Sequence, residues 1–178
     1  MNLNGKVAVV TGGASGIGLA IGKEFAASGA SIAVLDYDKD ALARLEDQIP
    51  GALGVACNVA NEAEVTEAFD QVAKHYSRLD IAILNAGILR DGMLLKVDRE
   101  TGKVSRKMGL AQWQSVLDVN LTGVFLTGRE AAAKMVDFGN GGVIVPLSSI
   151  ARHGNIGQSN YSAAKAGCAV LASVWGKE

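Results

Sequence analysis

The chain has 178 residues, of which 49% are hydrophobic and 20% are charged, with 22 glycines and only two prolines. This length and composition predict one globular α/β domain, residues 1-178, with a sizeable buried core. The formal net charge of −1 offers no basic surface for nucleic acid or an anionic membrane, so we expect neither as a partner.

The sequence favours a cytoplasmic protein. Its N-terminus lacks the basic-then-apolar pattern of a signal peptide, and no apolar run reaches the length of a membrane span. Cys57 and Cys168 lie far apart within apolar segments. Buried free thiols are the expectation, and a disulfide is the alternative. His75 and His153 show no metal-ligand spacing, so no metal site is predicted.

Apolar runs that fit strands alternate with segments of helical periodicity along the chain. The expected strands are 6–11, 31–36, 54–57, 80–85 and 142–147. The expected helices are 16–28, 38–49, 61–76 and 111–136, and a last one begins near Ser159 or Asn160. This alternation predicts βαβ units with right-handed crossovers, and therefore a doubly wound (Rossmann-type) parallel sheet with helices on both faces.

A glycine-rich turn joins the first strand to the first helix, with the sequence Thr11-Gly12-Gly13-Ala14-Ser15-Gly16-Ile17-Gly18. Glycines permit a tight turn and close approach of the backbone to a pyrophosphate, and the helix N-terminus offers N–H groups to the phosphates. Because a strand precedes the turn and an acidic residue ends the next strand, the pattern predicts a dinucleotide site. The candidate contacts are Gly12, Ser15, Gly16, Ile17 and Gly18.

Asp36, at the end of the second strand, bears on the choice of cofactor. Its carboxylate can accept hydrogen bonds from the adenosine ribose and would repel a 2′-phosphate. The adjacent Tyr37 and Asp38 provide no cation for that phosphate. We therefore expect NAD(H) rather than NADP(H). The alternative is that Asp36 only caps the next helix.

Tyr161 and Lys165 form the candidate proton-transfer pair. A spacing of four residues on a helix places the phenol and the ammonium on one face. A nearby cation stabilises the phenolate, so the tyrosine becomes a usable acid or base. The hydroxyl groups of Ser148 and Ser149 come from the preceding apolar segment.

Taken together, these motifs resemble the classical short-chain dehydrogenase/reductase family over essentially the whole chain. The resemblance also includes Asn58-Val59 after the third strand, Asn85-Ala86-Gly87 after the fourth, and Asn120 in the long helix. The segment from Gly154 to Tyr161 is most similar to 3-oxoacyl-carrier-protein reductases. The resemblance implies an enzyme that interconverts a secondary alcohol and a ketone by hydride transfer with a nicotinamide cofactor, which Asp36 leads us to expect to be NAD(H).

The resemblance also implies a role for each site residue. Tyr161 would exchange the proton with the substrate oxygen, Lys165 would assist it and hold the nicotinamide ribose, and a serine would hydrogen-bond the substrate oxygen. Asn120 would hold a water that relays protons from Lys165. Asn58 and Val59 would flank the adenine, and the cofactor cleft would be lined by Asn85, Ala86 and Gly87.

Which serine is catalytic is open at this point. The family's commonest spacing, counted back from Tyr161, gives Ser148, whereas the register of the fifth strand gives Ser149. Packing fixes strand register and loops absorb deletions more easily, so Ser149 is preferred.

Residues 95–107 look like an insertion relative to the family. Alternating residues around Glu100-Thr101-Gly102 predict a small hairpin with five basic and two acidic residues. A solvated excursion or an oligomer contact is expected, and a contact with an anionic carrier of the substrate is the alternative.

The chain ends soon after Lys165, where family members continue with further strands and a substrate-covering segment. We therefore expect a C-terminally incomplete dinucleotide-binding domain. Small residues on the last helix, which forms dimer surfaces in this family, suggest a homo-oligomer. The substrate is expected to be a small alcohol or ketone, with a 3-oxoacyl thioester as the best-supported candidate. The alternative function is a catalytically inert nucleotide-binding or oligomerisation module.

Overall fold

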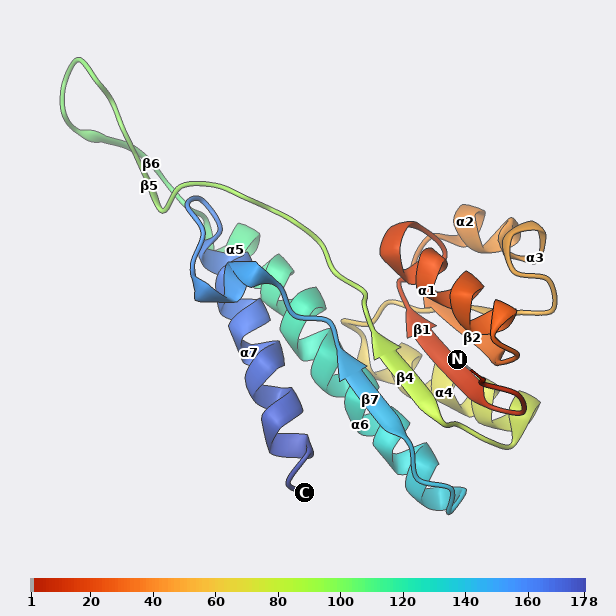
Figure 1. Cartoon of the computed structure of the whole chain (residues 1–178). Coiled ribbons are helices and arrows are strands. Elements are labelled where there is room, and N and C mark those ends of the chain that lie inside the picture. The colour runs from red at the N-terminus through yellow and green to blue at the C-terminus, as the bar shows by residue number, and fades with distance from the viewer. Residues whose placement is uncertain (1) are drawn as a thin grey trace. The chain divides into compact units, whose positions relative to one another are not determined.

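The structure is a computed structural model that describes residues 2–178 (Figure 1). The chain divides into two compact units. The first consists of the chain up to Ala86 together with Gly123–Pro146, and the second consists of Gly87–Thr122 together with Leu147–Glu178.

The first unit contains a five-stranded parallel sheet with the strand order β3-β2-β1-β4-β7. Its strands are β1 (Val7–Thr11), β2 (Ser31–Asp36), β3 (Leu53–Ala56), β4 (Ile81–Leu84) and β7 (Val143–Pro146). They correspond to the five strands expected from the sequence, with ends that differ by at most one residue. The doubly wound parallel fold class is confirmed.

Strand β1 lies at the centre of this sheet because both of its neighbours are parallel strands. Val10 pairs with Val34 of β2 and with Ile83 of β4. All five residues of β1 are buried, which explains why the strand reads as a continuous apolar run without alternation.

Helices cover both faces of the sheet (Figure 1). Helix α1 (Gly16–Ala27) packs on β1 and β2. Helices α4 (Glu62–Tyr76) and α6 (Gly123–Asp137) pack against each other, and α6 also contacts β4 and β7. The side chain of Asn61 caps α4 by accepting hydrogen bonds from the N–H groups of Ala63 and Glu64, as its residue type predicts.

The expected helix 38–49 is two short helices. Helix α2 (Lys39–Ala43) and helix α3 (Leu45–Gln48) are separated at Arg44. The cap of α2 is Asp38, whose carboxylate accepts hydrogen bonds from the N–H groups of Asp40 and Ala41. Asp36 is therefore not the helix cap, and the structure does not support that alternative reading of Asp36.

The expected helix 111–136 is interrupted. Helix α5 (Leu110–Leu117) ends in a π-helical turn, η1 (Asp118–Thr122), before α6 begins. A π turn widens the helix by one residue per turn and is frequent at functional sites. Here it coincides with Asn120, a residue selected from the sequence.

The second unit consists of a hairpin and a small helical assembly. Strands β5 (Leu95–Val97) and β6 (Val104–Lys107) form the antiparallel hairpin. The last helix, α7 (Ser159–Trp175), packs on α5, on η1 and on the 3-10 turn η2 (Ile150–His153). A Cβ atom on Gly167 would lie 2.7 Å from Leu121 Cδ1. This small residue thus serves packing inside the unit.

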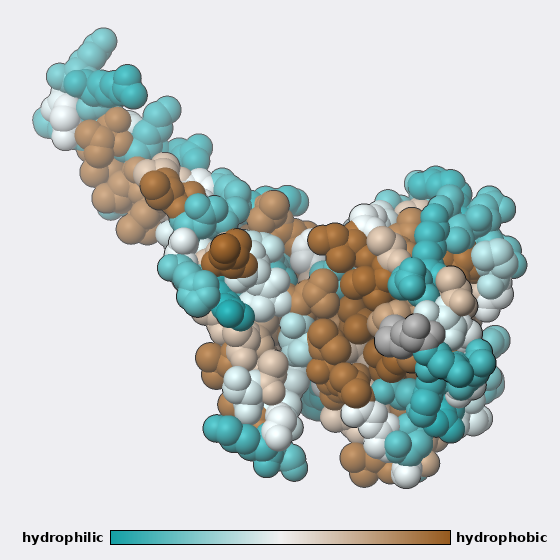
Figure 2. All heavy atoms as spheres, viewed as in Figure 1, coloured by the Kyte–Doolittle hydropathy of each residue, from teal (hydrophilic) through white to brown (hydrophobic). Residues whose placement is uncertain are grey.

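No helix within residues 2–178 has both the length and the apolar character that crossing a membrane requires. Cys57 and Cys168 are both buried free thiols. Figure 2 shows that apolar side chains remain on the surface of the molecule, and they include Val143 and Val145 of β7, which are 58% and 39% exposed.

Asp80 connects the beginnings of three strands. Its carboxylate accepts hydrogen bonds from Arg78, from Lys6 and from the N–H of Val7, and its carbonyl oxygen accepts the N–H of Val143. Burial alone would raise the pKa of Asp80, but the hydrogen bonds from Arg78, Val7 and Lys6 outweigh it and hold this pKa well below the usual range.

Replacing Asp80 by asparagine is expected to lower the free energy of unfolding by about 2 kcal/mol at neutral pH, because charge-assisted hydrogen bonds to a buried carboxylate are lost. The depressed pKa stabilises the fold above the ordinary carboxyl pKa of about 4, and this stabilisation disappears as the pH falls toward the folded-state value. Urea unfolding between neutral and acidic pH measures the difference. The exposed Asp137→Asn is the control, and a difference that does not change with pH would contradict the explanation.

Candidate functional site

The glycine-rich turn is held against the end of β4 by Thr11 and Asn85. The Thr11 hydroxyl oxygen accepts the N–H groups of Asn85 and Ala86 at 3.0 and 3.1 Å. The Asn85 side-chain amide donates to the carbonyl oxygens of Thr11 and Gly12, both at 3.0 Å. The threonine that opens the motif and the asparagine after the fourth strand therefore form one structural element, although 74 positions separate them.

Three glycines of the turn are required for different reasons. Gly12 and Gly16 have positive φ values of 62° and 53°, a conformation that other residues adopt at a cost. A Cβ atom on Gly18 would lie 2.3 Å from the Gly12 carbonyl oxygen and 2.6 Å from the Asn85 amide nitrogen. The helix can approach the turn this closely only because Gly18 has no side chain.

The first turn of α1 leaves its backbone donors available. Ser15 occupies the N-cap position without a side-chain capping bond, and no acidic residue lies in the first turn. The first N–H of this region that donates within the helix is that of Leu19, to Ser15. The glycine-rich turn and the start of α1 therefore fit a phosphate group, whose oxygens would accept hydrogen bonds from the free N–H groups.

Asp36 supports the turn from the neighbouring strand. One carboxylate oxygen accepts the N–H of Ala14 and the other accepts the N–H of Asp38, each at 3.0 Å. A carboxylate oxygen can accept two hydrogen bonds, so Asp36 keeps acceptor capacity for ribose hydroxyl groups while it fixes the turn.

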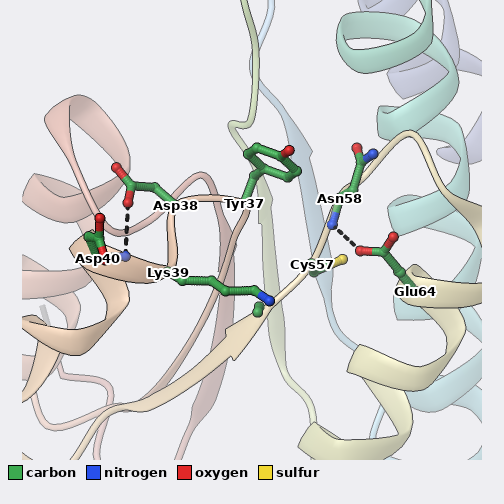
Figure 3. A pocket seen from close by; sticks show the side chains of 8 residues that line it. Tyr37, Asp38, Lys39, Asp40, Cys57, Asn58 and Glu64 are labelled. Carbon is green, nitrogen blue, oxygen red and sulfur yellow. Dashed lines mark hydrogen bonds between the residues drawn. The ribbon is translucent and has the colours of Figure 1, made fainter.

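An open pocket of about 690 Å³ lies beside this turn, between the ends of β2 and β3 (Figure 3). Asn58, a predicted adenine neighbour, lines the pocket, and its N–H donates to Glu64. Val59 does not line it. Val59 is 6% exposed, and its side chain fills the space beside Gly123, so only its backbone remains a candidate for the predicted contact with adenine.

The pocket also contains residues that the sequence analysis missed. Its lining residues are Tyr37, Asp38, Lys39, Asp40, Ala56, Cys57, Asn58 and Glu64. Lys39 is a cation only three positions beyond Asp36, and Figure 3 shows its side chain extended along the pocket toward β3. Burial, followed by the nearby Glu64, raises the pKa of Cys57 to about 11, so this thiol stays protonated.

In the second unit, α7 carries Tyr161 and Lys165 on one face, as their spacing predicts. The Lys165 ammonium lies 5.7 Å from the centre of the Tyr161 ring. Lys165 is 4% exposed, and its ammonium donates to the Leu147 carbonyl oxygen at 2.7 Å. Burial lowers the pKa of Lys165 from its ordinary value. The two candidate residues therefore share a partly enclosed environment.

The two candidate serines make different hydrogen bonds. The Ser148 hydroxyl donates its proton to the Lys165 carbonyl oxygen at 2.7 Å. The Ser149 hydroxyl oxygen accepts the N–H of Ala151 at 3.1 Å and caps η2. A serine has one proton to donate. That proton is already used at Ser148, whereas at Ser149 it is available for a substrate oxygen.

Asn120 is fully buried in the π turn. Its side chain accepts the N–H of Ile88 at 2.8 Å and donates to the Ile88 carbonyl oxygen at 2.9 Å. It therefore anchors the segment that follows β4, next to Gly87, where a Cβ atom would lie 3.4 Å from the Asn120 side-chain oxygen. The predicted water relay through Asn120 stays a prediction.

A second contact to Asn120 was not found from the sequence. The Cys168 thiol lies 3.0 Å from the Asn120 carbonyl oxygen and donates to it. Burial raises the pKa of Cys168, which keeps the proton on the sulfur. Cys168 lies three residues after Lys165 and so one helical turn along the same face, but a cysteine within an apolar helix gives no signal that would reveal this contact.

Comparison with known proteins shows which family the chain belongs to. The short chain dehydrogenase family matches residues 6–178. A 3-oxoacyl-[acyl-carrier-protein] reductase from Thermotoga maritima is 35% identical over the whole chain, which spans 70% of that relative. A D-threitol dehydrogenase from Mycolicibacterium smegmatis is 37% identical over 98% of the chain, which spans 66% of it. A 3-oxoacyl-[acyl-carrier-protein] reductase from Synechocystis is 37% identical over 93% of the chain, which spans 64% of that relative.

Solved structures show the same relationship. A short-chain type dehydrogenase/reductase from Mycobacterium marinum aligns with 98% of this chain at a TM-score of 0.82 and 33% sequence identity, and 67% of that protein is covered. The chain belongs to the short chain dehydrogenase family, a family of oxidoreductases that use a nicotinamide cofactor. The family and enzyme class expected from the sequence are confirmed, and the chain spans about two thirds of its relatives.

Replacing Gly18 by alanine is expected to destabilise the protein by about 1–3 kcal/mol, because the added methyl group has no space beside the Gly12 carbonyl oxygen. Gly109→Ala is the matched control, since that N-cap glycine has a negative φ and no atom within 4 Å of an added Cβ. Thermal unfolding of both variants gives the comparison. Equal stability of the two variants would contradict the explanation that Gly18 lies too close to the Gly12 carbonyl oxygen to carry a side chain.

Proposed function

We propose that this chain provides the cofactor-binding and proton-transfer residues of an NAD(H)-dependent oxidoreductase that interconverts a secondary alcohol and a ketone. The observation that carries the proposal is that the ammonium of the buried Lys165 lies 5.7 Å from the centre of the Tyr161 ring, on one face of α7. The Ser149 hydroxyl, in the same unit, keeps its proton free. A hydroxyl with a free proton, a phenol and a buried ammonium are the groups that proton transfer to a carbonyl oxygen requires.

Tyr161 is the proposed acid and base. When bound, the nicotinamide cofactor supplies or accepts the hydride. During reduction, the Tyr161 hydroxyl gives its proton to the substrate oxygen as negative charge develops there, and during oxidation it takes the proton back. No hydrogen bond to another residue of the described chain engages this hydroxyl group, so it can reach a substrate.

Lys165 supports Tyr161 electrostatically. Its ammonium stabilises negative charge on the phenolate oxygen, and this effect is strengthened where water is excluded. The hydrogen bond to the Leu147 carbonyl oxygen uses one of the three ammonium protons and fixes the side chain. Two donors remain for the nicotinamide ribose hydroxyl groups or for a water that returns the proton to solvent.

Ser149 is the proposed donor to the substrate oxygen. Its own hydroxyl oxygen is held by the N–H of Ala151, which orients the group without using its proton. Ser148 serves a structural purpose, because its hydroxyl ties the end of the strand segment to the Lys165 carbonyl oxygen.

The preference for NAD(H) rests on the charges around the pocket. Asp38, Asp40 and Glu64 line it together with a single cation, Lys39, so the lining has a net charge of −2. Asp36, beside the pocket, adds a further carboxylate. A 2′-phosphate would meet repulsion here, whereas ribose hydroxyl groups would find acceptors. Lys39 reduces this repulsion without reversing it.

The proposed substrate is a 3-oxoacyl or 3-hydroxyacyl thioester. The similarity to 3-oxoacyl-[acyl-carrier-protein] reductases over 93–100% of the chain supports it. The similarity to a D-threitol dehydrogenase supports a polyol as the second candidate. We further propose that the protein acts as a cytoplasmic homo-oligomer. An inert nucleotide-binding or oligomerisation module is the competing function, and NADH binding without turnover of any ketone would support it.

Cofactor choice can be measured by fluorescence titration. NADH is expected to bind more tightly than NADPH, and Asp40→Lys should narrow the difference by on the order of 1 kcal/mol, because a cation replaces an anion in the pocket. Asp47→Lys makes the same charge change outside the pocket and should leave the ratio of the two affinities unchanged. Tighter binding of NADPH to the unmodified protein would contradict the assignment.

The proton-transfer residues can be separated by turnover with a ketone panel. Tyr161→Phe is expected to reduce kcat by about 100-fold or more, with NADH binding retained. Ser149→Ala should reduce kcat by a comparable factor, because a donor to the developing charge is removed. Ser148→Ala should instead lower stability by about 1 kcal/mol and leave kcat nearly unchanged. The opposite result for the two serines would reassign the catalytic hydroxyl.

A further inference from the structure

The hairpin formed by β5 and β6 has two unlike faces. Lys96 lies directly opposite Arg106, and Val97 lies opposite Val104. Because paired residues in an antiparallel ladder point to the same face and successive residues alternate, Lys96 and Arg106 share one face. Leu95, Val97 and Val104 lie on the other face, together with Lys107, which pairs with Leu95; the register of the ladder shifts between Lys96 and Val97.

The apolar face is not covered. Leu95 is 45% exposed, Val97 is 51% exposed and Val104 is 48% exposed. Figure 1 shows the hairpin extending away from α5 and α7 within its unit, and Figure 2 shows apolar side chains on the part of the hairpin nearer its base, with hydrophilic ones at its tip. An isolated two-stranded hairpin is only marginally stable in water, so a partner on this face would stabilise it.

The cations of the hairpin are also without partners. Residues 95–107 contain five cations, namely Lys96, Arg99, Lys103, Arg106 and Lys107, and none of them forms an ion pair within residues 2–178. Like charges directly opposite each other destabilise a hairpin, and the Lys96–Arg106 pair is such a case. An anionic group bound there would remove this repulsion.

The acidic residues of the hairpin do not neutralise these cations. Asp98 is used within the turn, where one of its oxygens accepts the N–H groups of Glu100 and Thr101 and the Thr101 hydroxyl. Glu100 at the tip is the other carboxylate. With both carboxylates counted against the five cations, the hairpin still has a net charge of +3, while the rest of the chain carries −4.

We propose that the hairpin 95–107 is a docking arm for a protein partner whose surface combines carboxylates with exposed apolar side chains. The cations select an acidic surface by charge complementarity. The uncovered valines favour a protein over a nucleic acid, because a phosphate backbone offers nothing apolar to them. This arm is separate from the residues assigned to cofactor binding and proton transfer.

A second copy of the chain fits this surface less well. A symmetric contact would bring two hairpins of charge +3 together, which is repulsive. A contact from the hairpin of one copy to the acidic body of the next would be heterologous, and such contacts close only if they complete a ring.

Binding of a fluorescently labelled helical peptide tests the proposal, with glutamates on one face of the peptide and leucines on the other. The intact chain is expected to bind at about 0.05 M salt and to lose most of its affinity at about 0.5 M salt, because the charges are screened. Replacing the leucines of the peptide by alanine should weaken binding about tenfold, since the valines lose their apolar contact.

The decisive variant is Lys96→Glu with Arg106→Glu, which keeps a like-charged pair across the hairpin and so preserves its internal energetics. It is expected to weaken binding about tenfold or more. Lys74→Glu with Lys177→Glu, exposed positions outside the hairpin, changes the net charge equally and should alter binding by less than about twofold. Circular dichroism checks that both variants are folded, and Lys96→Gln with Arg106→Gln replaces the first variant if its spectrum changes.

Four outcomes would overturn the proposal. The first is that the chain does not bind the peptide at low salt, and the second is that the hairpin variant and the control variant bind the peptide equally well. The third is that the chain binds an RNA homopolymer or phosphatidylserine vesicles more tightly than the peptide. The fourth is self-association in sedimentation experiments that disappears with the hairpin variant, because it would identify a second copy as the occupant.

Discussion

The close approach of the glycine turn to the end of β4 is the constraint on which the first unit depends. With no side chain at Gly18, α1 can begin within contact of the Gly12 carbonyl oxygen and the Asn85 amide. Thr11 and Asn85 then satisfy each other's backbone groups across the two strands. The helix consequently starts with free donors at the carboxyl ends of the strands, where a parallel sheet binds its ligands.

The second unit depends in a similar way on one buried amide. Asn120 satisfies both the N–H and the carbonyl group of Ile88, and the π turn around it provides a backbone carbonyl that accepts the Cys168 thiol. Lys165 lies on the same helix as Cys168, and its ammonium donates a hydrogen bond to the Leu147 carbonyl oxygen. The Ser148 hydroxyl, which precedes this helix, donates to the Lys165 carbonyl oxygen. The proposed proton-transfer residues therefore rest on hydrogen bonds that fix backbone segments, and not on their contacts with one another.

Charge is divided unequally between the two units. The first has eight basic and thirteen acidic residues, and the second has nine basic and five acidic residues. The net charge of −1 for the whole chain does not reveal that the first unit is acidic and the second is basic. The proposed preference for NAD(H) rests on the acidic pocket of the first unit, and the proposed docking of an acidic partner rests on the basic hairpin of the second.

The sequence by itself determined the alternation of strands and helices, the glycine turn, Asp36, and the one-face spacing of Tyr161 and Lys165, because each depends on neighbouring residues and on local periodicity. Only the tertiary structure showed that Lys39 lines the pocket, that Val59 is packed inside, that η1 interrupts the long helix, and that Ser149 keeps its proton. Most of these properties depend on partners far away in the chain, such as Gly123 for Val59, and Asn58 and Glu64 for the pocket that Lys39 lines. The two serines could be told apart only because Ser148 meets the Lys165 carbonyl oxygen, 17 residues further on. Local patterns carry no information about contacts that form only when the chain folds.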